Sequence, residues 1–123
     1  MMVINKTIPV QTKGNCDMID LTPQIAKEIN SAGISNGVAT IFISGSTAGI
    51  TTIEYEAGLV SDFKSMWERN VPRNTNYQHD SRWGDGNGFS HVRASLLGPS
   101  LVVPFVNKKM ALGTWQQIIV IDF

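Results

Sequence analysis

The hydrophobic pattern predicts three strands most clearly. Residues 114–123 (TWQQIIVIDF) place large side chains alternately on two faces, which is typical of a β-strand. Residues 38–44 (VATIFIS) form a short β-branched run, which favours a buried strand over a helix. Residues 50–56 (ITTIEYE) alternate between apolar and polar side chains, so they predict a third strand.

Four further strands are less regular. They are expected at residues 3–12, 16–20, 101–106 and 110–112. The Gly14-Asn15 turn would join the first two of these as a hairpin. Pro104 lacks an amide donor, so the strand that contains it is expected at a sheet edge or a bulge.

The first of three predicted helices follows Thr22 and Pro23. These two residues are typical of an N-cap and of the first helical position. Ile25 and Ile29 give this helix an apolar face, and Gly33 is expected to end it.

The second predicted helix spans residues 58–70 and ends before Pro72. Its apolar residues recur at the spacing of a core-facing stripe: Leu59, Phe63, Met66 and Trp67. We interpret this stripe as core packing. Three helices among about seven strands predict an α+β fold with a largely antiparallel sheet or sandwich.

Length and charge limit the classes of function. A chain of 123 residues is expected to form a single domain over 1–123. Ten basic residues balance ten acidic ones, so we expect no nucleic-acid partner. The lone Cys16 fits a reducing cytoplasm, and no signal peptide or membrane-spanning run is present, so we expect a cytoplasmic protein without a membrane partner.

The richest candidate chemistry lies in residues 76–98 (NYQHDSRWGDGNGFSHVRASLLG). This stretch holds both histidines, His79 and His91, and several other polar groups: Asp80, Arg82, Asp85, Asn87, Ser90 and Arg93. Three alternating glycines favour a tight loop up to Phe89. The alternative is a solvated glycine-rich loop with two surface histidines, because a pair of histidines twelve residues apart matches no strict metal motif.

A third helix is predicted over residues 90–97, with Ser90 as its N-cap. His91 would then lie in the first turn, where free amides and the helix dipole favour an anion. His91 and Ser95 would share one face, while three apolar residues could turn inward: Val92, Leu96 and Leu97.

Three other features are weaker candidates. The small hydroxyl-bearing segment GSTAG (45–49) could let amides and the Ser46 or Thr47 hydroxyl approach an anion, or it could be a plain tight connection. Glu54 could serve as a base or a ligand, or it could lie on a solvated sheet face. Trp83 could stack on a flat substrate or simply cover the loop.

These motifs together resemble one known family. GSTAGITTIEYE, NYQHD, DGN, SHVRASLLGPSLVVPF and LGTWQQI occur in the order and spacing of the YjbQ family, also called the secondary thiamine-phosphate synthase family. The resemblance implies a homotrimer with sites near subunit boundaries. It also implies a weak activity that joins a pyrimidine methyl pyrophosphate to a thiazole phosphate with loss of pyrophosphate.

The resemblance also implies the site residues. The expected catalytic cluster is Glu54, His79, Asp85 and His91. By the same resemblance, Ser46, Thr47, Asn87, Trp115 and Gln116 are expected to bind the ligand. We add Trp83 as a ring that could stack on the pyrimidine and Arg93 as a guanidinium group for phosphate. A divalent metal, Mg²⁺ or Zn²⁺, is expected at His79 and His91, with no organic cofactor.

Two departures from the family pattern bear on these expectations. Many members read GNGHSH where this chain reads GNGFSH, so Phe89 replaces a histidine and a metal site would keep only His79 and His91. Members also usually continue past the last strand into an Asp-rich and Arg-rich segment. If no such segment supplies arginines to the site, Arg82 and Arg93 would be the main guanidinium groups for binding phosphate.

Three classes of function remain open from the sequence. The first is a thiamine-phosphate synthase-like transferase, in which aimed amides, arginines or a cation stabilise the leaving pyrophosphate. The second is a trimeric module that binds a small phosphorylated ligand or a metal without evolved catalysis. The third is a protein-interaction domain whose polar cluster only ties the histidine loop together.

Overall fold

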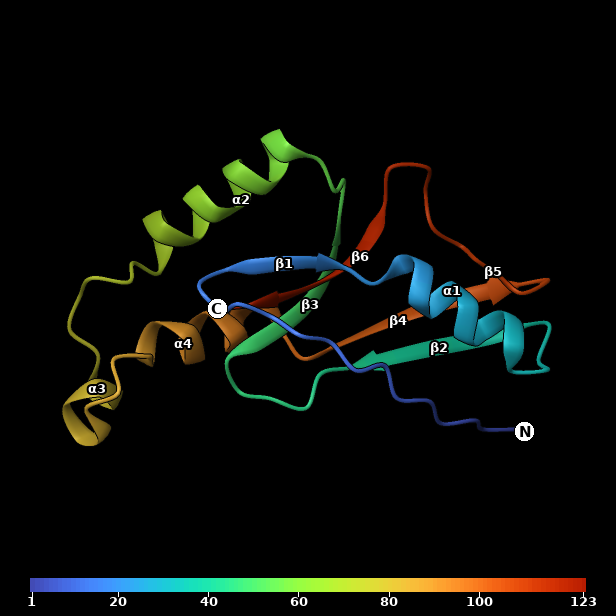
Figure 1. Cartoon of the computed structure of the whole chain (residues 1–123), viewed down its shortest axis with the longest axis horizontal. Helices are drawn as coiled ribbons and strands as arrows, with labels where there is room; N and C mark the ends of the chain where they lie inside the picture. The colour runs from blue at the N-terminus through green and yellow to red at the C-terminus, as the bar shows by residue number, and fades with distance from the viewer.

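The computed structural model describes residues 1–123 as an α+β domain with six strands and four helices (Figure 1). The strands are β1 (Asp17–Asp20), β2 (Gly37–Phe42), β3 (Ala48–Ile53), β4 (Ser100–Val106), β5 (Lys109–Met110) and β6 (Gln117–Asp122). The helices are α1 (Thr22–Ser31), α2 (Ala57–Asn70), α3 (Gln78–Trp83) and α4 (Gly88–Leu97). None of the helices is long and apolar enough to cross a membrane.

Two three-stranded antiparallel sheets form the β part of the molecule. The first has the order β1-β6-β3 and the second has the order β2-β4-β5. The strand predicted at the chain's end is β6, and it is the centre of the first sheet. The side chains of β6 alternate between the two faces of this sheet and so contribute to two hydrophobic cores. Ile119 and Ile121 enter one core cluster, while Ile118 and Val120 enter the other.

The two cores place the helices. One cluster holds Trp67 of α2 together with Phe89 and Ala94 of α4, so these helices cover one face of the β1-β6-β3 sheet. The other cluster holds Ile25 and Ile29 of α1 with the inner residues of β4. The first sheet is therefore a middle layer between α2 and α4 on one side and α1 with the second sheet on the other.

The strand predicted at residues 3–12 is wrong. This segment is extended but forms no backbone–backbone hydrogen bond, because no neighbouring strand pairs with it. The predicted hairpin is also wrong, since β1 pairs with β6 and lies beside a strand from the far end of the chain. The residue pattern of a segment can favour a strand, but the strand forms only when a neighbouring strand pairs with it.

The structure corrects two local predictions, one for the start of α1 and one for the strand that contains Pro104. The N-cap of α1 is Leu21, and the Thr22 hydroxyl accepts a hydrogen bond from the Ile118 amide at 2.8 Å. Pro104 lies in β4, the middle strand of its sheet, but β5 pairs only with Phe105 and Val106. Because β5 does not extend to Pro104, the missing amide donor of the proline leaves no sheet hydrogen bond unmade, as would be the case on an edge strand.

Candidate functional site

The centre of the site is a contact between α3 and α4. The Gly88 amide, at the start of α4, donates to Asp80 Oδ1 of α3 at 2.7 Å. A Cβ atom at Gly88 would lie 2.6 Å from Tyr77 Cβ and 3.0 Å from Asp80 Oδ1, so only glycine lets the two helices approach this closely. Tyr77 is itself fixed by donating its hydroxyl to the Pro72 carbonyl, and burial raises the pKa of this hydroxyl.

The sequence indicated Asp80 among the polar groups of residues 76–98 but did not assign it to the site, and the loop predicted up to Phe89 is wrong where α3 lies. The segment QHDSRW is short, polar and without an apolar stripe, so hydrophobic periodicity does not distinguish it from a loop. The available signal was the His79-Asp80 pair followed by a glycine-rich segment that could fold back on it.

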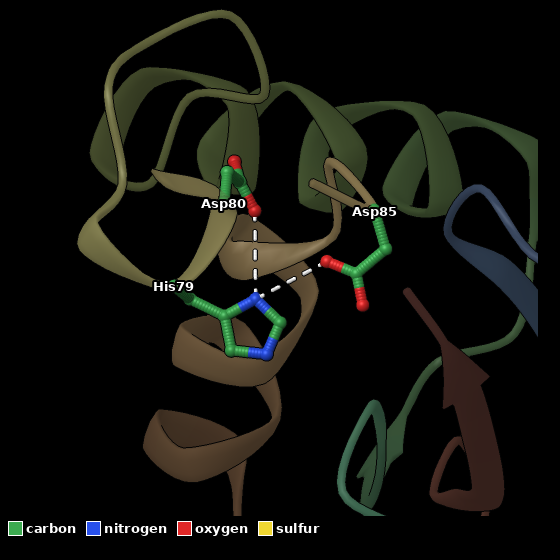
Figure 2. A group of neighbouring side chains, drawn as sticks. All are labelled: His79, Asp80 and Asp85. Atoms are coloured by element: carbon green, nitrogen blue, oxygen red, sulfur yellow. Dashed lines mark ion pairs between the residues drawn. The ribbon is translucent and has the colours of Figure 1, made fainter. Parts of the chain in front are cut away.

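His79 points its Nδ1 atom between two carboxylates. Nδ1 lies 3.5 Å from Asp80 Oδ1 and 3.5 Å from Asp85 Oδ1. Figure 2 shows the imidazole ring pointing this atom at both carboxylates. The atom is buried and has no hydrogen-bond partner, because both separations exceed normal hydrogen-bond length. One ligand atom from each residue lies within 4.8 Å of the others, so three potential metal ligands converge at one point.

His91 joins this group from α4. Its ring lies 4.4 Å from the His79 ring between centroids, with an angle of 39° between the planes. The structure therefore brings together the two histidines predicted to share a site. Asn87 lies beside them, and its amide nitrogen can donate to Asp85 Oδ1 at 3.0 Å.

A pocket of about 280 Å³ opens beside His91. It is lined by the following residues: Gly45, Ser46, Ala48, His91, Ala94, Ser95 and Pro99. The GSTAG segment therefore reaches the histidine, as the sequence suggested, because a close approach at Gly49 brings β3 against the end of α4. A Cβ atom at Gly49 would lie only 2.7 Å from Leu97 Cδ2.

The predicted start of α4 is wrong. The N-cap is Asn87, and Ser90 is a buried residue inside the helix. The His91 amide donates to the Asn87 carbonyl at 3.3 Å, so it is not free to bind an anion. The inward face is also different: Phe89, Arg93 and Ala94 are buried, while Val92 and Leu96 are exposed.

Phe89 does not face the histidines. It is 4% exposed and belongs to the core cluster with Trp67. Its ring lies between two guanidinium groups, 5.3 Å from that of Arg73 and 4.9 Å from that of Arg93. A histidine at this position would therefore point into the core, so we predict that Phe89 does not change the number of metal ligands.

Arg93 is also placed away from His91. It is 4% exposed, its Nε donates to the Val71 carbonyl at 2.9 Å, and its Nη2 pairs with Glu68 Oε2 at 2.9 Å. Arg93 therefore supports the packing of α2 on α4 and contributes no group to the pocket of His91.

Three predicted site residues lie at the other end of the first sheet. Gln117 opposes Ile53 at the end of β3 where Glu54 follows, and Trp115 and Gln116 directly precede Gln117. Glu54 is six residues beyond Ala48, which is roughly 20 Å along a strand. One subunit therefore does not bring Glu54, Trp115 or Gln116 to the histidines.

The remaining predicted residues lie on the surface or in the backbone framework. Thr47 accepts a hydrogen bond from the Phe123 amide through its carbonyl, at 3.0 Å. Trp83 ends α3 and is 64% exposed, with the Arg82 guanidinium 5.0 Å from its ring. The Trp83 ring therefore lies on the same helix as His79 but is largely open to solvent.

The fold is shared with several solved structures. A YbjQ-like protein of unknown function from Sulfolobus solfataricus is 31% identical, with a TM-score of 0.87 over 92% of this chain and 80% of that one. An uncharacterised YjbQ/UPF0047 protein from Clostridium acetobutylicum is also 31% identical, with a TM-score of 0.85 over 93% and 86% of the two chains. These structures define the class as YjbQ-like α+β proteins.

Sequence comparison gives the family. The model of the UPF0047 protein YjbQ-like family matches residues 6–123. A UPF0047 protein from Methanothermobacter thermautotrophicus is 41% identical over 118 residues, covering 96% of this chain and 81% of the relative. YugU, a UPF0047 protein of Bacillus subtilis, is 32% identical over 120 residues, covering 96% and 88%. The chain belongs to the YjbQ family, which confirms the resemblance found in its motifs.

Proposed function

We propose that the chain binds a divalent cation through His79, Asp80 and Asp85, and a small phosphorylated molecule in the adjacent pocket lined by Ser46 and His91. The observation that carries this proposal is the buried Nδ1 atom of His79, which has no hydrogen-bond partner and faces two carboxylate oxygens at 3.5 Å. A buried polar atom without a partner is costly unless something else satisfies it.

The donor set fits a divalent cation. Imidazole nitrogen with carboxylate oxygen suits Zn²⁺ and related transition metals, whereas Mg²⁺ prefers oxygen ligands alone. This favours Zn²⁺ over Mg²⁺ at the three residues. Asp80 would be a positioned ligand, because the Gly88 amide holds its Oδ1 atom.

The reaction that we propose is a weak thiamine-phosphate synthase-like transfer. The bond from the pyrimidine methylene carbon to pyrophosphate breaks, and a bond from the same carbon to the thiazole forms. When bound, the cation would stabilise the negative charge that develops on the leaving pyrophosphate. His91 would donate a hydrogen bond or a proton to a phosphate oxygen, and the Ser46 hydroxyl would hold a second oxygen.

A homotrimer is part of this proposal. On the outer face of the second sheet, four large apolar side chains are more than half exposed: Val38, Phe42, Val102 and Val106. Such a contiguous apolar face favours contact with another protein surface. A neighbouring subunit could also bring Glu54 and Trp115 to a site that they cannot reach within one chain.

Titration of untagged protein with Zn²⁺ in a calorimeter tests the cation site. We expect binding of one ion per chain, with at least a tenfold loss of affinity in Asp85→Asn, since removing one ligand weakens metal affinity strongly. Asp62→Asn is the control, because Asp62 is an exposed carboxylate on α2 outside the cluster. Equal Zn²⁺ affinity in the wild type and Asp85→Asn would rule out a cation site at these three residues.

A binding module without evolved catalysis is the second candidate. It is favoured by the openness of the cluster, since the Asp85 side chain is 49% exposed and enzymes of this type usually exclude water. The two candidates differ in pyrophosphate release from the mixed substrates. Release that depends on His91 supports the transferase, whereas tight binding of thiamine phosphate without release supports the module.

A further inference from the structure

A second pocket lies between α2 and the turn that precedes β1. Its volume is about 340 Å³, and it is lined by Asn15, Cys16, Lys64, Ser65, Glu68 and Arg93. It shares no lining residue with the pocket of His91. Arg93 and His91 are two positions apart on α4, which is about 200° around a helix, so the two pockets use opposite faces of α4.

The charge of this pocket is positive. Lys64 and Arg93 line it, and both lie close enough to the Cys16 thiol to lower its pKa against the larger raising effect of burial. Arg73 does not line the pocket, but it donates a hydrogen bond of 2.6 Å to the side-chain oxygen of the lining residue Asn15. Glu68 is the one carboxylate in the lining.

The charge of Glu68 is already matched. Its Oε2 atom accepts from Arg93 Nη2 at 2.9 Å, and its Oε1 atom accepts from the Arg73 amide at 3.0 Å. These contacts lower the pKa of Glu68, the backbone hydrogen bond from Arg73 most of all. The Lys64 ammonium makes no ion pair, so the pocket holds a cation without a partner.

The pocket also presents neutral donors from two sides. Ser65 contributes a hydroxyl from α2, and Asn15 contributes its amide nitrogen, because its oxygen is bonded to Arg73. Asn15 and Cys16 have φ values of 57° and 65°, which non-glycine residues rarely adopt. Strained backbone of this kind is concentrated at binding sites.

We propose that this pocket binds the phosphate group of a small molecule. A dianionic phosphate matches the unpaired Lys64 ammonium, the remaining N–H groups of the Arg93 guanidinium and the two neutral donors. The site is separate from the proposed cation site, because its lining shares no residue with His79, Asp80 and Asp85 or with the pocket of His91.

The test is a titration with inorganic phosphate at constant ionic strength, followed by calorimetry and by the melting temperature. We expect Lys64→Gln to weaken phosphate binding about tenfold and Ser65→Ala about fivefold, the usual effects of losing a charged and a neutral hydrogen bond. Lys27→Gln is the matched control, since Lys27 is an exposed lysine on α1 and should leave the affinity unchanged.

Two results would overturn the proposal. One is the absence of phosphate binding in the millimolar range, or equal affinity in the wild type and Lys64→Gln. The other is a loss of phosphate binding in His91→Ala with no loss in Lys64→Gln, which would assign phosphate to the pocket of His91. Asp85→Asn should bind phosphate normally here even if it loses the cation, so the two proposals can fail separately.

Discussion

The rings of His79 and His91 come from two helices and lie 4.4 Å apart between centroids. The short α3 helix positions His79, and α4 positions His91 against the GSTAG segment. One histidine therefore faces the two carboxylates while the other faces the pocket. This division of roles gives each histidine a different experimental signature.

The first prediction concerns His91. We expect His91→Ala to lower turnover about 10²–10⁴-fold, the usual contribution of a positioned acid or base, if the site releases pyrophosphate. The melting temperature should change little, because His91 is only partly buried and its side chain makes no hydrogen bond in the structure. Gln24→Ala is the control, because Gln24 is an exposed residue of α1 that does not line the pocket. Normal turnover in a destabilised protein would contradict the role of His91.

The regular parts of the fold could be predicted because their patterns are local. The stripe of α2 and the alternation of β6 each report which faces are buried, and both elements were confirmed. The segment 3–12 mixes apolar and β-branched residues but has no partner strand, so the prediction failed there.

The site could be predicted only in part. The density of polar residues indicated the histidine loop, but the roles of Phe89 and Arg93 depend on packing. A helical arginine beside a glycine-rich loop suggests a ligand of the histidine site, whereas in the fold Arg93 packs against the rings of Phe89 and Phe123, pairs with Glu68 and does not line the pocket of His91. Such long-range partners leave no periodic signal.

The second prediction concerns the spacing between α3 and α4. Gly88→Ala should weaken Zn²⁺ binding about tenfold or more, because the added Cβ atom would displace Tyr77 and the Asp80 carboxylate. Gly113→Ala is the matched control, since a Cβ atom there would meet nothing closer than 3.7 Å. Calorimetry that gives the same Zn²⁺ affinity for both variants would show that the close approach is not needed.

The third prediction concerns Phe89. Phe89→His should not raise Zn²⁺ affinity, because the side chain lies in the core between Arg73 and Arg93. It should reduce the free energy of unfolding by roughly 3 kcal/mol, through lost apolar burial and a polar ring in the core. Denaturant unfolding and zinc calorimetry on the one variant measure both effects. A gain in zinc affinity would place residue 89 in the histidine cluster.

The fourth prediction concerns the core beneath α2. Trp67 is 5% exposed and packs edge-on against Phe123, with ring centroids 4.9 Å apart. Trp67→Ala should cost roughly 3–5 kcal/mol of unfolding free energy, whereas Phe63→Ala should cost less because Phe63 is only half-buried. Equal losses in urea melts would contradict this order of burial.

The last prediction is the pH dependence of the Glu68–Arg93 pair. The Arg73 amide and the Arg93 guanidinium lower the pKa of Glu68 below its ordinary value of 4.5. The unfolded chain therefore binds a proton at Glu68 more readily than the folded chain does. The stabilisation is fully present above pH 4.5 and is lost as the pH falls through the lower folded pKa.

We expect the wild type to have a higher melting temperature than Glu68→Gln at neutral pH, and this gap between the two melting temperatures should narrow in acid. High salt should reduce the gap as well, since the Glu68 side chain is 55% exposed. Asp62→Asn on the same helix should show no such gap, because Asp62 makes no ion pair. A constant difference between wild type and Glu68→Gln from neutral pH to pH 3 would show that the carboxylate charge does not stabilise the fold.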